Sequence, residues 1–392
     1  MTSLISADNV YALLTVFLGL AAFGFWSERT KLGQALSGVI LVILAGLLLA
    51  NFRVIPFAAP FYDLVWGYAV SLAIPLLLFR ADFKKILPEI GPMALSFVIA
   101  SIGTIAGVLV GASVIDMGPE GANIAATLGA SWIGGSMNFA ATSQALGMND
   151  GALLSAMAAA DNVGATLFLM LLVLLPASKT VLRFLPSKIV QAHVHIEGGA
   201  VETETPSLNM FHIAGFLSLS ALCCFLGYGT ARLIGMYGAD MGLDWLADFS
   251  RYGVLFVTIY ALLVANFFSA RLSSMQGDFS LGMLFMYVFF GVMGAGADVM
   301  ALLGQALPIF AFTGIMASVH LLVVLSAAKL FRIDLAEMVL ASNAVALGPA
   351  TAAAQAAGQG WRSLVTPAVM LGVLGYSIAN FIGVAMAGWL AQ

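Results

Sequence analysis

Long apolar runs separated by short polar stretches extend over almost the whole chain. A helix that crosses a bilayer needs roughly 20 mostly apolar residues. About twelve such runs are present, at about 9–26, 35–52, 62–79, 92–115, 122–147, 151–176, 210–235, 250–269, 280–296, 302–328, 335–357 and 364–390. Only helices and closed barrels satisfy their backbone hydrogen bonds in lipid, and these runs are too long and continuous for barrel strands. The pattern therefore predicts an all-α polytopic membrane protein.

A polar segment at residues 177–208 interrupts this pattern and divides the chain into halves of similar size. It contains charges of both signs and two prolines, Pro186 and Pro206, so we expect a linker at the membrane surface. Its two histidines, His193 and His195, are more typical of a solvated loop than of a metal site.

The two halves carry similar short motifs in the same order. In each half, one apolar run ends in an Ala-Asp pair, a later run contains Ala-Ser, and a third contains Ala-Ser before a Gly-containing break. The matched segments are Phe79–Asp82 with Ala295–Asp298, Ile99–Ser101 with Met316–Ser318, and Ala130–Gly135 with Ala341–Pro349. The shared order indicates an internal duplication.

Charges in the matched loops have opposite signs. The loop after the third run is basic and its counterpart is acidic, whereas the loop after the fourth run is acidic and its counterpart is basic. The residues are Arg80, Lys84 and Lys85 against Asp298, and Asp116 and Glu120 against Lys329 and Arg332. Because basic loops face the cytoplasm, this predicts two inverted-topology repeats. With twelve runs, six crossings separate matched spans and would give them the same orientation, which conflicts with the opposite charges of their loops. We rely on the charges for the orientation of the repeats and expect about 11–13 transmembrane helices.

Composition supports lipid as the solvent of this chain. Of 392 residues, 61% are hydrophobic and 9% are charged, against about 45–50% and about 25% in soluble domains. The sequence has no basic stripe, phosphate-binding glycine loop or metal-spaced His/Cys cluster, which excludes nucleic-acid binding and zinc chemistry. We expect no cofactor, and no metal beyond Na⁺. The adjacent Cys223 and Cys224 indicate packing or lipid-facing residues rather than a disulfide framework.

Two apolar runs contain residues that weaken a membrane helix at matched places. The first reads Ser131-Trp132-Ile133-Gly134-Gly135-Ser136-Met137-Asn138, and the second continues from Ser342-Asn343 to Gly348-Pro349-Ala350-Thr351. Glycine tolerates extended backbone, and proline removes a helix donor and frees a carbonyl one turn earlier. Unwound backbone at this depth is tolerated only where protein buries it or where it lines a watery cavity.

Such paired breaks are typical of transporter binding sites, because half-helix N-termini attract anions and freed carbonyls attract cations. The candidate substrate- or ion-binding residues are Ser131, Gly134, Gly135, Ser136, Asn138, Asn343, Gly348, Pro349 and Thr351. The alternative is that Gly and Pro only permit a kink or close packing. Close packing is our interpretation of Gly103, Gly107 and Gly111, which recur every four residues.

Asp161 and Asn162 lie deep within the sixth apolar run. A carboxylate near the bilayer centre costs about 2.5–3.5 kcal/mol on insertion scales, so it normally faces the protein interior and has a function. Desolvation favours the protonated form of such a group and a bound cation favours the ionised form, which suits alternating proton and sodium occupancy. We expect this pair to couple ion movement. The alternative is an acid satisfied by a neighbouring polar group, with no transport cycle.

Five further polar residues are secondary candidates for ligand contact. His320 has a side chain of the kind that titrates near neutral pH, although a membrane histidine more often only hydrogen-bonds across helices. Gln144 and Gln355 follow the two breaks at similar distances, and Ser377 and Asn380 share one face of the last run.

Several of these segments together resemble the YjcL-like membrane proteins, the family of domain of unknown function 819. The segments are Ile74–Asp82, Ser131–Asn138, Ala160–Val163, and Ala341–Asn343 with Gly348–Thr351, and the likeness extends from about residue 35 onward. The resemblance implies kinship with the cation–proton antiporter and bile-acid symporter group, with crossed broken helices, an elevator-type core, a scaffold and a homodimer. It also makes Asp161 and Asn162 similar to the adjacent carboxylate and carboxamide that bind the coupling ion in antiporters.

This resemblance and the duplication together imply five segments. We expect scaffold helices of the two repeats at 1–91 and 209–300, core (transport) helices at 92–176 and 301–392, and the surface linker at 177–208.

The leading hypothesis is a secondary active transporter in the bacterial inner membrane. It would move a small anionic organic solute, such as a carboxylate, an amino acid or a short peptide, with Na⁺ or H⁺ as the coupling ion. The alternative is a Na⁺/H⁺ antiporter without an organic substrate, and a third hypothesis is a membrane receptor that does not transport. An enzyme is disfavoured, because only Asp161 lies clearly within a run and intramembrane catalysis needs paired groups at one depth.

Overall fold

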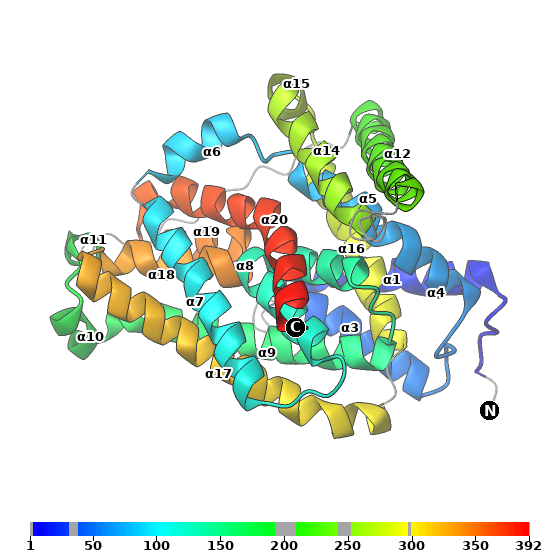
Figure 1. Ribbon diagram of the computed structural model, residues 1–392, viewed down its shortest axis with the longest axis horizontal. Helices are drawn as coiled ribbons and strands as arrows, with labels where there is room; N and C mark the ends of the chain where they lie inside the picture. The colour runs from blue at the N-terminus through cyan, green and yellow to red at the C-terminus, as the bar shows by residue number, and fades with distance from the viewer. Residues whose placement is uncertain are drawn as a thin grey trace. The chain divides into compact units, whose positions relative to one another are not determined.

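The computed structural model describes residues 3–30, 38–91, 93–192, 209–241, 252–296 and 299–391. These residues are largely helical, and none of them lies in a β-strand, which confirms the predicted all-α class (Figure 1). Two features of the sequence, the histidines His193 and His195 and the acidic residue Asp298, lie outside the described residues.

Eight helices of the described chain are long and apolar enough to cross a bilayer. They are Val10–Ser27, Pro60–Leu78, Met93–Val114, Gly151–Ala177, Met210–Gly238, Asp278–Ala295, Ala306–Phe331 and Ser363–Leu390. Three shorter apolar helices cover Leu41–Asn51, Gly253–Phe267 and Leu335–Leu347. The eight long helices coincide with predicted runs, so the chain is an all-helical membrane protein. The total of about twelve spans and the inverted relation of the two halves stay predictions.

The helices form two compact units, and each unit collects segments from both halves of the chain. Unit 1 comprises Met1–Phe79, Ser143–Val163 and Ser207–Phe310, and unit 2 comprises Arg80–Thr142, Gly164–Pro206 and Ala311–Gln392. Three helices contribute residues to both units: α8 (Gly121–Ala145), α9 (Gly151–Leu174) and α17 (Val299–Phe331). The division into scaffold and transport segments stays a prediction.

Unit 1 contains, besides its parts of the shared helices, two groups of helices from the two halves of the chain. The first group is α1 (Val10–Ser27), α3 (Gly38–Asn51), α4 (Pro60–Leu64), one π-helical turn (Val65–Ala69) and α5 (Val70–Leu78). The second group is α12 (Met210–Asp240), α14 (Gly253–Phe267), α15 (Ser269–Ser273) and α16 (Asp278–Ala295).

Glycines bring α3 and α16 into backbone contact within unit 1. A Cβ atom on Gly46 would overlap the carbonyl oxygen of Gly291, and one on Gly294 would overlap that of Ile43. Because lipid gives helices no hydrophobic reason to associate, close approach of this kind supplies van der Waals contact that larger residues would prevent.

Helix α5 is tied to α12 by polar contacts around Ser71. The Ser71 and Tyr228 hydroxyl oxygens lie 2.6 Å apart, and the Cys224 thiol donates to the Ser71 carbonyl at 3.1 Å. Ser220 donates to the Leu72 carbonyl at 2.7 Å. Cys223 is a free thiol buried in an apolar cluster, as predicted for a packing residue.

Unit 2 contains most of α8, the second part of α9 and most of α17, together with several helices of its own. These are α6 (Phe83–Ile90), α7 (Met93–Val114), a short 3₁₀ turn (Leu175–Ala177), α10 (Lys179–Phe184), α11 (Lys188–Ala192), α18 (Leu335–Leu347), α19 (Pro349–Gly358) and α20 (Arg362–Leu390).

Two segments of unit 2 that the sequence suggested to be loops contain helices. The basic loop after the third run forms α6, because Asp82 caps it by accepting from the Lys84 amide at 3.1 Å, and Ile86 and Ile90 bury one face. The first part of the predicted linker forms α10 and α11. Asp334 ties α11 to the start of α18, since its carboxylate accepts from the Ser187 hydroxyl at 2.5 Å and the Lys188 amide at 2.9 Å.

The three glycines of α7 face α17, which confirms their role in close packing. A Cβ atom on Gly107 would lie 2.5 Å from the Met316 carbonyl oxygen, and one on Gly111 would lie 2.7 Å from the Phe312 ring. Gly103 meets the backbone of His320 one turn farther along.

We predict that Gly294→Val destabilises the protein by about 1–3 kcal/mol, because its side chain must displace the backbone of α3. The apparent midpoint of thermal unfolding, followed by tryptophan fluorescence of the detergent-purified chain, measures the effect. Gly19→Val is the matched control, since no atom lies within 4 Å of a Cβ at that exposed position of α1. Equal midpoints for the two variants would contradict the proposed contact.

Candidate functional site

The backbone of α8 departs from helical geometry at its two adjacent glycines. Gly134 has φ −142° and ψ 20°, and Gly135 has φ 69° and ψ −177°. The second pair of angles lies in a region that is essentially restricted to glycine. The break that Gly134-Gly135 predicted in the sequence is therefore present, and it divides α8 into two half-helices.

The second predicted break separates α18 from α19 at Gly348. This glycine has φ 92° and ψ −175°, in the same glycine-restricted region as Gly135. Pro349 then opens α19, at a position where proline is favoured because its missing N–H has no helical partner to lose. Both breaks use one glycine in an extended conformation of positive φ.

Within unit 2, one helix packs against both breaks. Helix α20 presents Gly375 to the Ile133 carbonyl and Gly372 to Pro349, and a Cβ atom on either glycine would overlap that backbone. Tyr376 lies between these contacts: its ring is 3.3 Å from a Cβ built on Gly135, and its hydroxyl oxygen is 3.0 Å from one built on Gly348. The structure thus brings the two breaks together around Tyr376, with α18, α19 and α20 side by side (Figure 1).

The carbonyls of Gly134 and Gly348 both have hydrogen-bond donors. The Asn138 amide donates to the Gly134 carbonyl at 2.8 Å, and the Gly348 carbonyl accepts from the Ala352 amide at 3.3 Å, with the Thr351 hydroxyl 3.1 Å away. These contacts matter because an unpaired buried carbonyl is costly.

The side chains around the second break form a closed network. The Asn343 amide donates to Gln355 Oε1 at 2.6 Å and lies 3.3 Å from the Thr351 carbonyl, and its oxygen accepts from the Thr351 hydroxyl at 2.7 Å. Gln355 in turn donates to the Leu172 carbonyl of α9 at 3.2 Å. The predicted residues Asn343, Thr351 and Gln355 therefore lie together and largely satisfy one another.

The first break, in contrast, leaves polar atoms without partners. Asn138 Oδ1, Thr142 Oγ1 and Trp132 Nε1 are buried and make no hydrogen bond to the described residues. A Cβ atom on Gly383 would lie 3.0 Å from Thr142 Oγ1, which places this hydroxyl against α20. Within the described residues, these three side chains of α8 therefore keep hydrogen-bonding capacity near the first break.

His320 connects three helices near the first break. Its Nδ1 lies 2.9 Å from the Thr104 hydroxyl, which also approaches the Trp132 carbonyl at 3.2 Å, and its Nε2 lies 3.0 Å from the Ser342 hydroxyl. The ring is completely buried and packs edge-on against Phe168. Both ring nitrogens have hydroxyl partners, so His320 links α7, α17 and α18 by hydrogen bonds.

The remaining candidates at the breaks differ in burial and bonding. Ser131 is buried and Ser136 is half-buried. On α20, the Ser377 hydroxyl donates to the Val373 carbonyl of its own helix at 2.9 Å, and Asn380 is buried. The Ser377 hydroxyl proton is thus used in a hydrogen bond within its own helix.

Asp161 is buried in α9, with 5% of its surface exposed. Asn162 is half-buried, and its amide donates to the Ala158 carbonyl one turn earlier at 2.7 Å. Both belong to unit 1, whereas both breaks belong to unit 2. Burial of Asp161 agrees with the expectation that a carboxylate within a membrane helix faces the protein interior. Its role in ion coupling stays a prediction.

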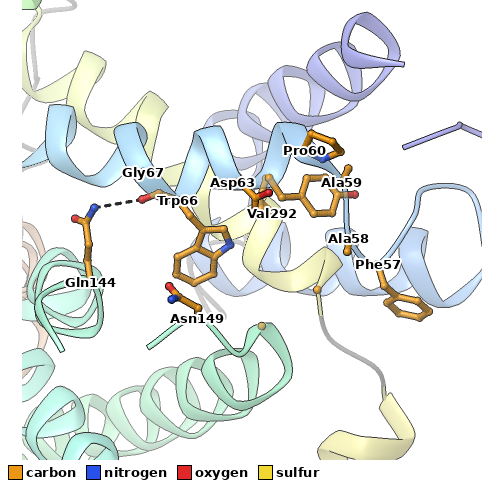
Figure 2. Close-up of a pocket in the computed structure, with 13 residues that line it drawn as sticks. Phe57, Ala58, Ala59, Pro60, Asp63, Trp66, Gly67, Gln144, Asn149 and Val292 are labelled. Carbon is orange, nitrogen blue, oxygen red and sulfur yellow. Dashed lines mark hydrogen bonds between the residues drawn. The ribbon is translucent and has the colours of Figure 1, made fainter. Parts of the chain in front are cut away.

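Gln144 also lies in unit 1 and contributes to a separate feature there. Its amide donates to the Trp66 carbonyl in the π-helical turn at 3.2 Å and approaches the Ser71 hydroxyl at 3.1 Å. It lines an open cavity of about 840 Å³, together with residues of α4 and of the segment that starts α9 (Figure 2). Gln144 and Gln355 therefore occupy different units and are not equivalent in their surroundings.

A sequence profile of the family described as "Protein of unknown function (DUF819)" matches residues 15–392. The chain belongs to this family. A relative described as "Uncharacterized membrane protein YjcL", from Bacillus subtilis (strain 168), is 33% identical over 400 residues, and the match covers 100% of each chain. The resemblance that the sequence motifs indicated is confirmed at the level of this family.

Sequence reasoning missed the residues of the DUF819 chain that complete the first break. Thr142 stands beside Ser143 and Gln144, and Tyr376 beside Ser377, and neither belongs to a motif that would single it out. A signal was available in the spacing of Gly372, Gly375 and Gly383, because small residues on one face of a membrane helix indicate a close neighbour. That neighbour proved to be the pair of breaks.

We predict that Gly135→Ala and Gly348→Ala each destabilise the chain by about 1–3 kcal/mol, because alanine is strained at these φ/ψ values. Thermal unfolding of the purified variants measures the loss. Gly314→Ala is the control: that exposed glycine of α17 has no atom within 4 Å of a Cβ, so its midpoint should stay at or above that of the parent. Unchanged midpoints for both break variants would refute the glycine requirement.

Proposed function

We propose that this DUF819 protein is a secondary active transporter whose substrate site lies at the paired helix breaks of unit 2. The observation that carries the proposal is the set of buried unpaired atoms, Asn138 Oδ1, Thr142 Oγ1 and Trp132 Nε1, beside unwound backbone. A protein tolerates such groups where a polar ligand satisfies them for part of its cycle.

Electrostatics of the breaks suit charged ligands. Each break creates the C-terminus of one half-helix and the N-terminus of another, so partial charges of both signs meet near Tyr376. The N-terminal ends at Ser136 and Pro349 favour a carboxylate, and the C-terminal ends favour a cation. We infer that the solute is a small organic anion, such as a carboxylate, an amino acid or a short peptide.

Ion coupling is assigned in this proposal to Asp161 with Asn162. A membrane carboxylate can hold either a proton or a cation, so its occupancy can follow the Na⁺ or H⁺ gradient. The pair also resembles the coupling residues of the cation–proton antiporter and bile-acid symporter group. Kinship with that group, an elevator-type cycle, a homodimer and residence in the bacterial inner membrane all belong to the same proposal.

A Na⁺/H⁺ antiporter without an organic substrate is the second candidate. One observation favours it: Asn343, Thr351 and Gln355 already satisfy one another at the second break, which leaves few groups there for an organic molecule. Free oxygens at the first break alone are better matched to an ion than to a larger solute.

Purified protein in proteoliposomes distinguishes these functions. With the carrier, succinate, glutamate or dialanine accumulates inside the vesicles only while a Na⁺ or H⁺ gradient is present. With the antiporter, a Na⁺ gradient alone drives proton movement, measured with an internal pH dye. Wild-type vesicles that show neither activity would contradict both transport functions.

We predict that Asp161→Asn abolishes gradient-driven flux in this assay, because the substituted side chain cannot exchange a proton for a cation. Elution on size-exclusion chromatography should stay as in the parent, since Asn is nearly isosteric with Asp. Asp116→Asn, in the exposed turn before α8, is the control and should transport normally. Flux through Asp161→Asn at the parental rate, still responsive to pH and sodium, would remove this residue from the mechanism.

A further inference from the structure

The open cavity of unit 1 lies where three helices begin or end. Helix α4 begins at Pro60, α9 begins at Gly151 and α16 ends at Ala295, and residues at these ends line the cavity. Its volume of about 840 Å³ is within the range of small-molecule sites.

The full charge that the described residues bring to this cavity is negative. Of the described lining residues, Asp63 alone is a carboxylate and none is basic. Its side chain is exposed and makes no ion pair or hydrogen bond within the described chain. Partial helix-dipole charges of both signs reach the cavity, positive from the N-termini of α4 and α9 and negative from the C-terminal end of α16, so Asp63 supplies the full charge among the described lining residues. A positive ligand group is therefore favoured.

Aromatic rings accompany the carboxylate. Trp66 extends from the π-helical turn into the opening, near Asn149, and Phe57 and Tyr62 contribute to the walls (Figure 2). The Tyr62 hydroxyl donates to the Pro56 carbonyl at 2.8 Å and its buried ring packs against Phe17, so this residue supports the wall and Trp66 is the half-buried ring at the opening. A cation over an indole or phenol face is stabilised by the ring quadrupole.

Asn149 supplies a polar group that no protein atom uses. Its exposed amide makes no hydrogen bond within the described chain, whereas Gln144 is held by the Trp66 carbonyl and by Ser71. Gln144 thus holds the part of the cavity wall that includes Trp66. The Asn149 amide remains available for a ligand.

A purely structural role for Asp63 does not explain this arrangement. An acid in the first turn of α4 stabilises the helix N-terminus, and Asp63 occupies such a position. That role requires neither a cavity nor an indole ring and a free amide facing the same opening. Nor do the lining groups suit a hard metal ion, which needs six or more oxygen ligands in the case of Ca²⁺.

We propose that the unit 1 cavity binds the ammonium group of a small organic cation or zwitterion, with Asp63 as the counter-charge, Trp66 as the aromatic face and Asn149 as a hydrogen-bond partner. This binding does not rest on the proposed transport activity, because every group involved lies in unit 1 and none is at the helix breaks.

Isothermal titration of the full-length protein in detergent tests the proposal, with 2-phenylethylammonium, tetramethylammonium and phenylacetate as probes. The two ammonium probes should bind and phenylacetate should not. Asp63→Asn should weaken ammonium binding about tenfold or more, the loss expected when a charged partner becomes neutral. Trp66→Leu should weaken it about threefold, in line with an exposed cation–π contact.

Asp8→Asn is the matched control, because Asp8 is an exposed carboxylate of unit 1 that lies outside the cavity. It should bind the ammonium probes as the parent does. Absence of ammonium binding to the parent, equal binding by Asp63→Asn, or preferred binding of phenylacetate would each overturn the proposal. These titrations require no flux, so a failure of transport in proteoliposomes leaves their outcome unaffected.

Discussion

The need to satisfy every backbone polar group inside the membrane governs this structure. A continuous helix meets that need by itself, whereas a broken one exposes carbonyl and amide groups that lipid cannot hydrogen-bond. The chain interrupts two helices, at Gly134-Gly135 and at Gly348, and surrounds both interruptions with protein. Helix α20 does this by lacking side chains where the breaks approach it, so that Gly372 and Gly375 meet backbone directly. The breaks and the glycine face of α20 are therefore one feature.

The two breaks satisfy their backbone carbonyls with different residues, and they differ in which polar side-chain atoms stay unpaired. At the second break the Ala352 amide donates to the Gly348 carbonyl and the Thr351 hydroxyl donates to Asn343, so the described groups form a closed network. Asn138 satisfies the Gly134 carbonyl with its amide but leaves its oxygen unpaired, and Thr142 is unpaired as well. A closed network holds the backbone in one conformation, whereas unpaired acceptors are stabilised when a hydrogen-bond donor or a cation reaches them. Among the described residues, the first break thus keeps unpaired polar atoms, whereas the side chains of the second break largely satisfy one another.

Sequence reasoning found what local chemistry determines. The apolar runs gave eight long helices in the expected places, and Gly135 and Gly348 marked both breaks because no other residue accepts their backbone angles. It did not find Tyr376, because that residue matters through packing between helices far apart in the sequence. It also paired Gln144 with Gln355 by distance from the breaks, whereas the chain folds them into different units. Spacing along a helix predicts neighbours on that helix and carries no information about the partner helix.

The lengths of the half-helices place the unpaired atoms away from bulk water. Helix α18 has 13 residues before Gly348, and the stretch from Gly121 to Ile133 before the first break has the same length. At 1.5 Å per residue each half-helix extends roughly 20 Å, short of the approximately 30 Å hydrocarbon thickness. A half-helix that starts at a membrane face therefore ends within the hydrocarbon region. Asn138 follows the first break within about one turn, so in a half-helix that starts at a membrane face it lies at a depth that solvent reaches only along a path made by the protein.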